Sequence, residues 1–190
     1  MRTPLVTALA ALSAAVALSV HPAQAQTPTD TAAPPIAAVR GGAYFPFNSR
    51  IKNTVGKTWY GGGLDYTYGQ KAGLSRSILS LDYIERSGGG GTVRLIPVTI
   101  GQFTVQGGSN SQGSSVKPYF GVGVGAYFVH QTIPNDVGII ETNNVTTIGG
   151  YVAAGLDLPS NLLLEARYHI LPKVGSANSS GLQLMGGFRF

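Results

Sequence analysis

The feature that most constrains the fold is a two-residue alternation of apolar with small or polar side chains, which recurs after residue 35. Such alternation predicts β-strands rather than helices, and Gly, Asn, Ser and Pro residues divide it into segments. Eight segments result, at residues 36–47, 58–69, 75–87, 92–106, 117–130, 145–158, 161–171 and 181–190.

The two faces of each segment differ in size as well as in polarity. In residues 181–190, Leu182, Leu184 and Phe188 share one face, whereas small or polar residues occupy most of the other. A soluble β-sandwich also alternates, but its strands are usually about five or six residues long. A tilted strand needs about 9–11 residues to cross a bilayer, and Gly on the second face suits the narrow interior of eight strands. We therefore predict an all-β fold, an eight-stranded antiparallel transmembrane up-and-down β-barrel over residues 36–190.

The composition excludes several functional classes. The chain has no Cys, which removes disulfide scaffolds, thiolate nucleophiles and Cys-ligated zinc. It has only 3 His, so we expect no His-rich metal site and no cofactor. The formal net charge is +5, but the basic residues are scattered, whereas a nucleic-acid surface needs them clustered on one face.

The N-terminus has the pattern of a secretory signal peptide. Arg2 is followed by an apolar stretch at residues 5–20 and by Ala23, Gln24 and Ala25, a small-x-small cleavage pattern. An uncleaved membrane anchor is the alternative, but the apolar stretch has only 16 residues, whereas a membrane span needs about 20. We expect cleavage after residue 25, a flexible leader at residues 26–35, and export to the cell outer membrane of a diderm bacterium.

The gaps between segments indicate an orientation. With the N-terminus in the periplasm, the expected extracellular gaps are residues 48–57, 88–91, 131–144 and 172–180. The expected periplasmic gaps are residues 70–74, 107–116 and 159–160. Outer-membrane barrels have long extracellular loops and short periplasmic turns. Two gaps depart from this rule, since 88–91 is short and 107–116 is long.

Several motifs resemble a known family. Residues 117–128 (KPYFGVGVGAYF) resemble the fifth-strand signature of small outer-membrane β-barrel proteins, including the OmpW-like and OmpX-like groups. Residues 96–101 (IPVTIG) and 164–168 (LEARY) are similar to the fourth and seventh strands of that family. Phe188 and Phe190 are similar to the C-terminal signal read by the barrel-assembly machinery. The resemblance implies this machinery and outer-membrane lipids as partners and, for an OmpW-like protein, passage of small hydrophobic solutes.

Charged residues mark the predicted lumen. On the face assignment above, those that point inward are Arg40, Asp65, Arg76, Asp82, Arg86, Arg94, Asp157, Glu165, Arg167 and Arg189. A lumen charge network is expected in the periplasmic half, formed by Arg40, Asp65, Asp157, Glu165, Arg167 and Arg189. A buried charge needs a partner. Either these residues form a salt-bridge plug or they line an ion path, and the narrow interior of eight strands favours the plug.

Glycines line the same face. They are Gly61, Gly63, Gly121, Gly123, Gly125, Gly149, Gly155 and Gly187. A phosphate-binding loop would need a strand followed by a helix N-terminus, whereas this repeat lies within strands. We expect these glycines to make room for Trp59, Tyr119, Tyr127 and Tyr151. A Gly-lined cavity for an apolar molecule is the alternative.

Catalysis has little support in the sequence. After residue 25 the histidines are His130 and His169, and no G-x-S-x-G nucleophile motif is present. His130 with Asp136 is the one hint of an outer-membrane lipid-modifying enzyme. We expect no enzyme and no catalytic residues. The predicted function is structural or surface-binding through loops 131–144 and 48–57, and the alternative is a narrow OmpW-like channel for small hydrophobic solutes.

Overall fold

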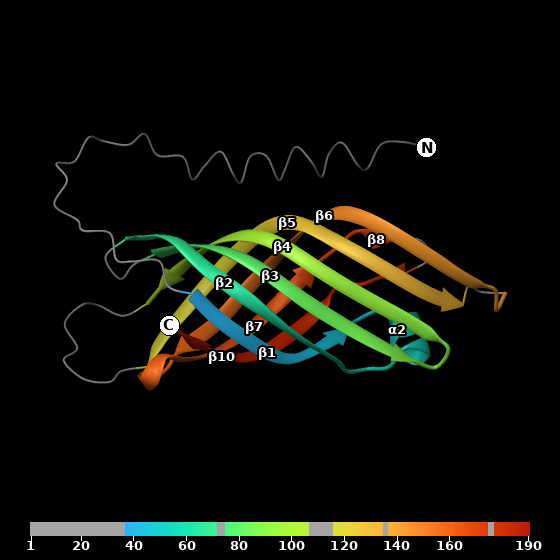
Figure 1. Ribbon diagram of the computed structural model, residues 1–190, viewed down its shortest axis with the longest axis horizontal. Helices are drawn as coiled ribbons and strands as arrows, with labels where there is room; N and C mark the ends of the chain where they lie inside the picture. Colours follow the sequence, from blue (N-terminus) through green and yellow to red (C-terminus); the bar gives the residue numbers. More distant parts are fainter. Residues whose placement is uncertain (1–36, 72–74, 107–115, 135–136, 175–176) are drawn as a thin grey trace. The chain divides into compact units, whose positions relative to one another are not determined.

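The computed structural model describes residues 37–71, 75–106, 116–134, 137–174 and 177–190 (Figure 1). Eight long strands close into one barrel in the order β1-β10-β7-β6-β5-β4-β3-β2, and every adjacent pair is antiparallel. They are β1 (Ala37–Pro46), β2 (Trp59–Lys71), β3 (Ser75–Gly88), β4 (Gly91–Val105), β5 (Lys117–Pro134), β6 (Ile140–Asp157), β7 (Leu162–Ile170) and β10 (Gly181–Arg189). Each corresponds to one predicted segment, so the predicted up-and-down barrel is confirmed.

Four short elements complete the described chain. They are helix α2 (Ser49–Thr54), the 3-10 turn η1 (Pro159–Asn161) and the two-residue strands β8 (Lys173–Val174) and β9 (Ala177–Asn178), which pair with each other. Within these described ranges no helix is long and apolar enough to cross a membrane. The signal peptide and leader predicted for residues 1–35 lie outside the described residues, as do residues 107–115 of the long predicted turn.

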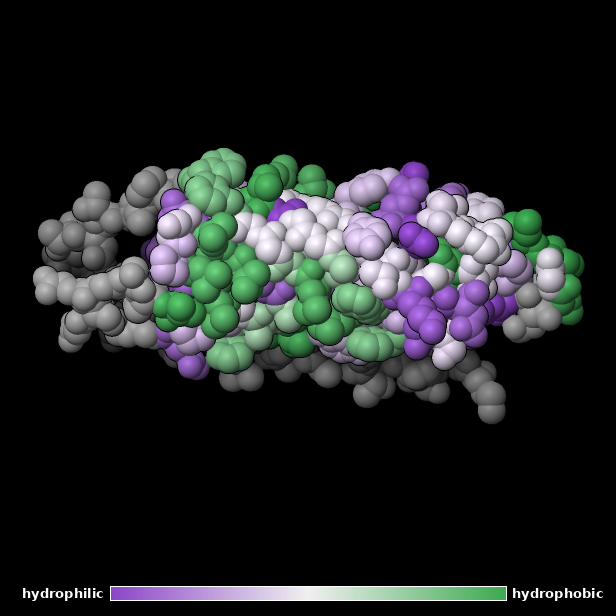
Figure 2. All heavy atoms as spheres, turned by 90° about the horizontal axis from the view of Figure 1, so that it is seen from below, coloured by the Kyte–Doolittle hydropathy of each residue, from purple (hydrophilic) through white to green (hydrophobic). Residues whose placement is uncertain are grey.

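Inside and outside alternate along every strand. In β4, Val93, Leu95 and Phe103 are buried in the lumen, whereas Val98 and Ile100 are exposed on the outer wall. Other large apolar side chains on the outer wall include Leu64, Leu81, Val122, Phe120, Val152 and Leu164. Figure 2 shows hydrophobic residues gathered over one part of the wall, a more hydrophilic band beside them, and hydrophobic residues again at the far tip. We call the end where β1 begins and β10 ends the terminal end, and the opposite end the α2 end (Figure 1).

The barrel wall is uneven at the α2 end, which the sequence did not predict. Residues 131–144 were expected to be a loop, but β5 continues to Pro134 and β6 begins at Ile140. In contrast, β7 first pairs with β6 at Gly150 and Ile170. The inward and outward alternation continues through the extension, with Ile133 buried, but Thr and Asn residues on the outer face disguise it. Strands β3–β6 therefore extend past β7 as an open sheet.

Helix α2 closes the mouth at the α2 end, where the sequence predicted only a loop. The side chain of Asn48 caps it by accepting from the amide of Ile51, and Ile51 and Val55 are buried beneath it. The β3–β4 turn lies against the helix, because a Cβ at Gly89 would be 2.0 Å from the carbonyl oxygen of Thr54. The short predicted gap at 88–91 is thus a tight turn between Gly88 of β3 and Gly91 of β4.

Candidate functional site

The lumen is filled by side chains, and its most polar layer is centred on Arg40. This guanidinium lies 2.8 Å from Asp65 and 3.0 Å from Asp82 through Nη2, and 3.3 Å from Glu165 through Nη1. Its side chain is fully buried. Small neighbours make this possible, since a Cβ at Gly63 would be 2.0 Å from Oδ1 of Asp82. Acids from three other strands thus converge on one cation.

A second buried cation, Arg167, binds two of the same acids. Its Nη2 lies 2.7 Å from Oε1 of Glu165, and its Nη1 lies 3.3 Å from Oδ2 of Asp82. Its guanidinium also covers the ring of Tyr151 at 4.2 Å. The hydroxyls of Ser80 and Tyr119 donate to Asp65 (2.6 Å) and to Glu165 (3.0 Å). Two arginines and three acids give this layer a formal charge of −1.

Arg76, Asp157 and Arg189 form a separate cluster nearer the terminal end. Asp157 accepts from Arg76 at 2.9 Å and from Arg189 at 3.0 Å. The structure therefore divides the six residues predicted as one network, with Asp157 and Arg189 in this cluster and the other four around Arg40. Asp82 joins the Arg40 layer and Arg76 joins this one. The parity of the strands placed both residues in the lumen, but their partners could not be read from the sequence.

On the α2 side of the charged layer, the lumen holds neutral polar side chains and then apolar ones. Nε2 of the buried His169 donates to Gln183 at 2.8 Å, and its Nδ1 accepts from the hydroxyl of Tyr127 at 2.9 Å. Nε2 of Gln131 donates to the hydroxyl of Ser179 at 2.5 Å. Beyond these groups a continuous apolar cluster reaches the α2 end, made by Tyr44, Ile51, Val55, Trp59, Ile84, Val93, Leu95, Tyr127, Val129, Ile133, Leu171, Val174 and Ala177.

Four of the eight lumen-facing glycines make room for an aromatic ring, as predicted. A Cβ at Gly123 would lie 2.3 Å from the ring of Tyr151, and one at Gly155 would lie 2.3 Å from the ring of Tyr119. A Cβ at Gly121 would meet Phe103 at 2.3 Å, a neighbour that the sequence did not indicate. Aromatic rings therefore face Gly121, Gly123, Gly149 and Gly155, whereas the other four glycines lie against backbone or non-aromatic side chains.

The outer wall carries a polar surface on β3–β6, and one prediction fails there. Arg94 was expected to face the lumen, but it faces outward and pairs with Glu85 at 3.1 Å, with 43% of its side chain exposed. Lumenal positions of β4 are instead Val93 and Leu95. An arginine faces outward at low cost where water or headgroups solvate it.

Arg94 belongs to what we call the outer polar panel. Strand register places the panel in two rows across β3, β4, β5 and β6. The first row is Glu85, Arg94, His130 and Asn144, and the second is Ser87, Thr92, Thr132 and Thr142. The first row continues on β2, β1 and β10 as Tyr60, Ala43 and Leu184, which are apolar or aromatic.

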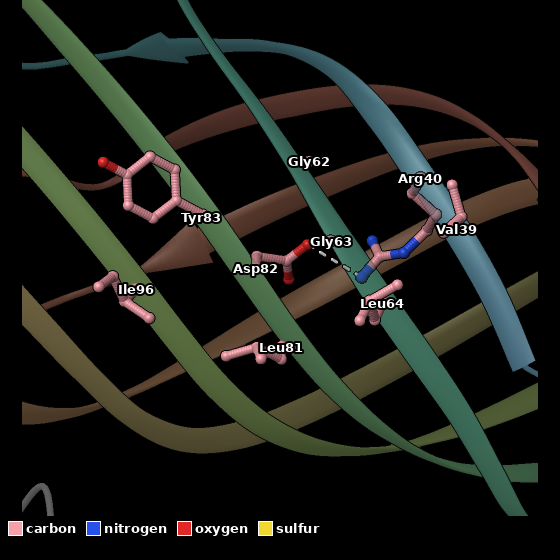
Figure 3. A pocket seen from close by; sticks show the side chains of 9 residues that line it. All are labelled: Val39, Arg40, Gly62, Gly63, Leu64, Leu81, Asp82, Tyr83 and Ile96. Carbon is pink, nitrogen blue, oxygen red and sulfur yellow. Dashed lines mark hydrogen bonds and ion pairs between the residues drawn. The ribbon is translucent and has the colours of Figure 1, made fainter.

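A groove of about 450 Å³ lies beside the panel on the outer wall. Figure 3 shows it over Gly62, with Leu64 and Leu81 on one side and Tyr83 and Ile96 toward the panel. Gly62 lies in register with Gly41, which lies in register with Gly186, so that three adjacent strands lack outward side chains here. The paired Arg40 and Asp82 lie on the lumenal side of the same strands (Figure 3).

The described residues offer little for catalysis or metal binding. Across the described ranges no group of three or more His, Asp or Glu could hold a metal ion. His130 contacts Asn144 at 2.5 Å and Thr132 at 3.4 Å. Asp136, its predicted acid partner, lies outside the described residues. The expectation that the protein is not an enzyme therefore stays a prediction.

This architecture, a closed antiparallel barrel with an apolar outer wall and a filled lumen, is that of the small outer-membrane β-barrels. The barrel is similar to Neisserial surface protein A, with a TM-score of 0.64 at 15% identity over 84% of this chain and 98% of that one. Ail of Yersinia pestis matches with a TM-score of 0.51 at 17% identity over 82% and 98%. The N-terminal barrel domain of Pseudomonas aeruginosa OprF matches at 0.50 and 18% over 84% and 100%.

At these identities the likeness shows the shared fold, in agreement with the resemblance seen in the sequence. No family model matches the sequence, and no curated protein does.

Proposed function

We propose that this protein is an integral outer-membrane barrel that does not conduct and that acts through the surface it presents outside the cell. The filled lumen carries this proposal. The charged layer around Arg40 and the apolar cluster beneath α2 lie in series along the same interior. Eight strands enclose room for little beyond side chains, and here the side chains meet across the lumen.

The outer-membrane location is supported by the apolar outer wall and by the similarity to outer-membrane barrels. Exposed apolar residues occur on all eight strands, among them Val39, Leu79, Ile100, Val122 and Leu184. A soluble monomer rarely exposes so extensive an apolar surface, whereas a bilayer covers it. The α2 end then faces outward from the cell and the terminal end faces the periplasm.

The open sheet of β3–β6 is the surface best placed to bind a partner. It extends past β7, and in the described residues no strand pairs with residues 142–149 of β6 on the β7 side. At its tip Val137 is 77% exposed, and Ile139 and Ile140 are each 62% exposed. An open strand edge and an apolar tip are both common binding features.

Planar-bilayer conductance of residues 26–190, refolded in detergent, tests the proposal. A heat-dependent shift in gel mobility serves as the control for folding. We expect folded protein that gives no conductance steps. Discrete steps from folded protein would overturn the proposal and favour the alternative, a narrow channel for small hydrophobic solutes.

Phe188 and Phe190 are proposed to direct assembly by the barrel-assembly machinery. Deletion of Phe190 in cells should lower the amount of folded protein in the outer membrane, while refolding in detergent proceeds as before. An unchanged membrane yield would remove this role from the terminal aromatic residues.

A further inference from the structure

We propose that the groove over Gly62 and the outer polar panel together form a binding site for a phosphorylated glycolipid of the outer leaflet. The groove would hold one acyl chain, and Arg94 and its neighbours on the panel would bind a phosphate on the sugar headgroup. This inference rests on the outer-membrane location proposed above but not on whether the lumen conducts.

The groove has the chemistry of an acyl-chain site. Its volume of about 450 Å³ lies in the range of about 300–1,000 Å³ common for small-molecule sites. Val39, Leu64, Leu81 and Ile96 supply apolar walls, and Gly62 leaves the floor without a side chain (Figure 3). A chain lying there would contact backbone and methyl groups at once and would bury more surface than on a flat wall.

The groove is continuous with the panel through Tyr83. The ring of Tyr83 lines the groove, and its hydroxyl donates to Glu85. Glu85 accepts from Nε of Arg94, whose guanidinium lies 5.7 Å from the centre of the Tyr83 ring. The groove thus ends in an aromatic ring on its panel side, and a charged row follows. This arrangement is expected at the boundary between acyl chains and headgroups.

Charge and hydrogen-bonding groups on the panel suit a sugar phosphate. Arg94 binds Glu85 through Nε and Nη2, at 3.1 and 3.5 Å, which leaves Nη1 for a phosphate oxygen. His130 follows Arg94 directly in register and adds a second group able to bind an anion. The panel also offers hydroxyls that can hydrogen-bond to those of a sugar, on Ser87, Thr92, Thr132 and Thr142. A simple phospholipid headgroup has fewer hydroxyls to bind them.

Native mass spectrometry of the full barrel in detergent tests the site with three probes. These are bisphosphorylated lipid A, its monophosphoryl form, and phosphatidylglycerol. We expect wild-type protein to retain bisphosphorylated lipid A most strongly. Arg94→Gln should lower its affinity roughly five-fold, in the range of an exposed ion pair. Glu85→Gln should raise the affinity, since it removes the carboxylate that competes with phosphate.

Matched variants separate the site from general effects. Lys117→Gln removes an exposed cation at the start of β5, at the terminal end and away from the panel, and should leave affinity unchanged. Leu81→Trp fills the groove and should lower binding of both lipid A forms roughly ten-fold. Val122→Trp introduces the same side chain at an outer-wall position that does not line the groove and should have no effect. Heat-dependent gel mobility shows that each variant is folded.

Two results would overturn the proposal. One is equal retention of phosphatidylglycerol and bisphosphorylated lipid A, which would show a general layer of anionic lipid. The other is wild-type affinity in folded Arg94→Gln and Leu81→Trp. Lipid binding is measured in detergent, so its loss would overturn the binding site alone. The outer-membrane location is tested separately, by the yield of folded protein in the membrane.

Discussion

The two halves of the lumen are closed by different chemistry. Toward the terminal end, buried arginines and acids converge from opposite walls around Arg40 and Arg167. Toward the α2 end, Trp59, Ile51 and their neighbours form an apolar cluster beneath a short helix. The charged half depends on every partner being present, because an unpaired buried charge is costly. The apolar half can lose a methyl group and still exclude water.

Removal of Arg167 from the charged half should give the largest loss of stability. Arg167→Leu leaves Glu165 and Asp82 with Arg40 as their remaining strong partner, and we expect a loss of about 3–5 kcal/mol in the free energy of unfolding. Denaturant unfolding followed by the fluorescence of Trp59, the one Trp in the chain, measures it. Arg94→Leu, which breaks an exposed pair, should cost about 1 kcal/mol or less. Equal losses in the two variants would contradict the distinction.

Truncation of Ile51 should weaken the apolar half without opening it. Ile51→Ala removes a fully buried side chain from α2 and should cost about 2–3 kcal/mol in unfolding free energy. The charged layer below remains intact, so bilayer recordings should stay silent. Conductance in this variant would show that α2 alone closes the barrel.

A methyl group added at a glycine that faces a lumenal ring should destabilise the barrel more than one added on the outer wall. Gly123→Ala places a Cβ 2.3 Å from Tyr151, which we expect to cost about 1–2 kcal/mol by overpacking. Gly41→Ala, whose new Cβ would lie 3.9 Å from its nearest neighbour on the outer wall, should be neutral. Similar unfolding curves for the two variants would argue against ring packing as the role of these glycines.

The smallest expected effect concerns the cap of α2. Asn48→Ala removes the side-chain acceptor for the amide of Ile51 and should cost about 1 kcal/mol. Asn53→Ala, on the exposed side of the same helix, is the control and should change stability little. A neutral Asn48→Ala would mean that packing against the β3–β4 turn holds the helix without its cap.

The strands could be predicted from the sequence because inside and outside alternate so regularly. The departures have physical causes. Helix α2 is too short to show a helical period, and its signals are only the cap at Asn48 and the pair Ile51 and Val55. The extension of β5 and β6 was not predicted because its outer face is polar. A polar outer face argues against a strand that contacts lipid, but it is ordinary in a strand that extends beyond the membrane.

The candidate site was less predictable than the fold. Parity placed Arg40 and Asp82 in the lumen, yet which charges pair depends on how strands meet across the barrel, and no local pattern encodes that. Arg94 faces outward although a charge within an alternating strand favours the lumen, because Glu85 pairs with it on the outer wall. The panel follows only from the register of β3–β6, which joins residues far apart in the sequence.

The first row of the panel continues in register across seven of the eight strands, from Asn144 and His130 to Tyr60, Ala43 and Leu184. Since strands in a barrel tilt, one row of hydrogen-bonded neighbours does not stay at one depth. The chain has no Cys, so single cysteines introduced along this row would report how deeply each position lies in the membrane. A water-soluble thiol reagent should modify His130→Cys readily and Ala43→Cys slowly, and the crossover between them would locate the membrane surface on the protein.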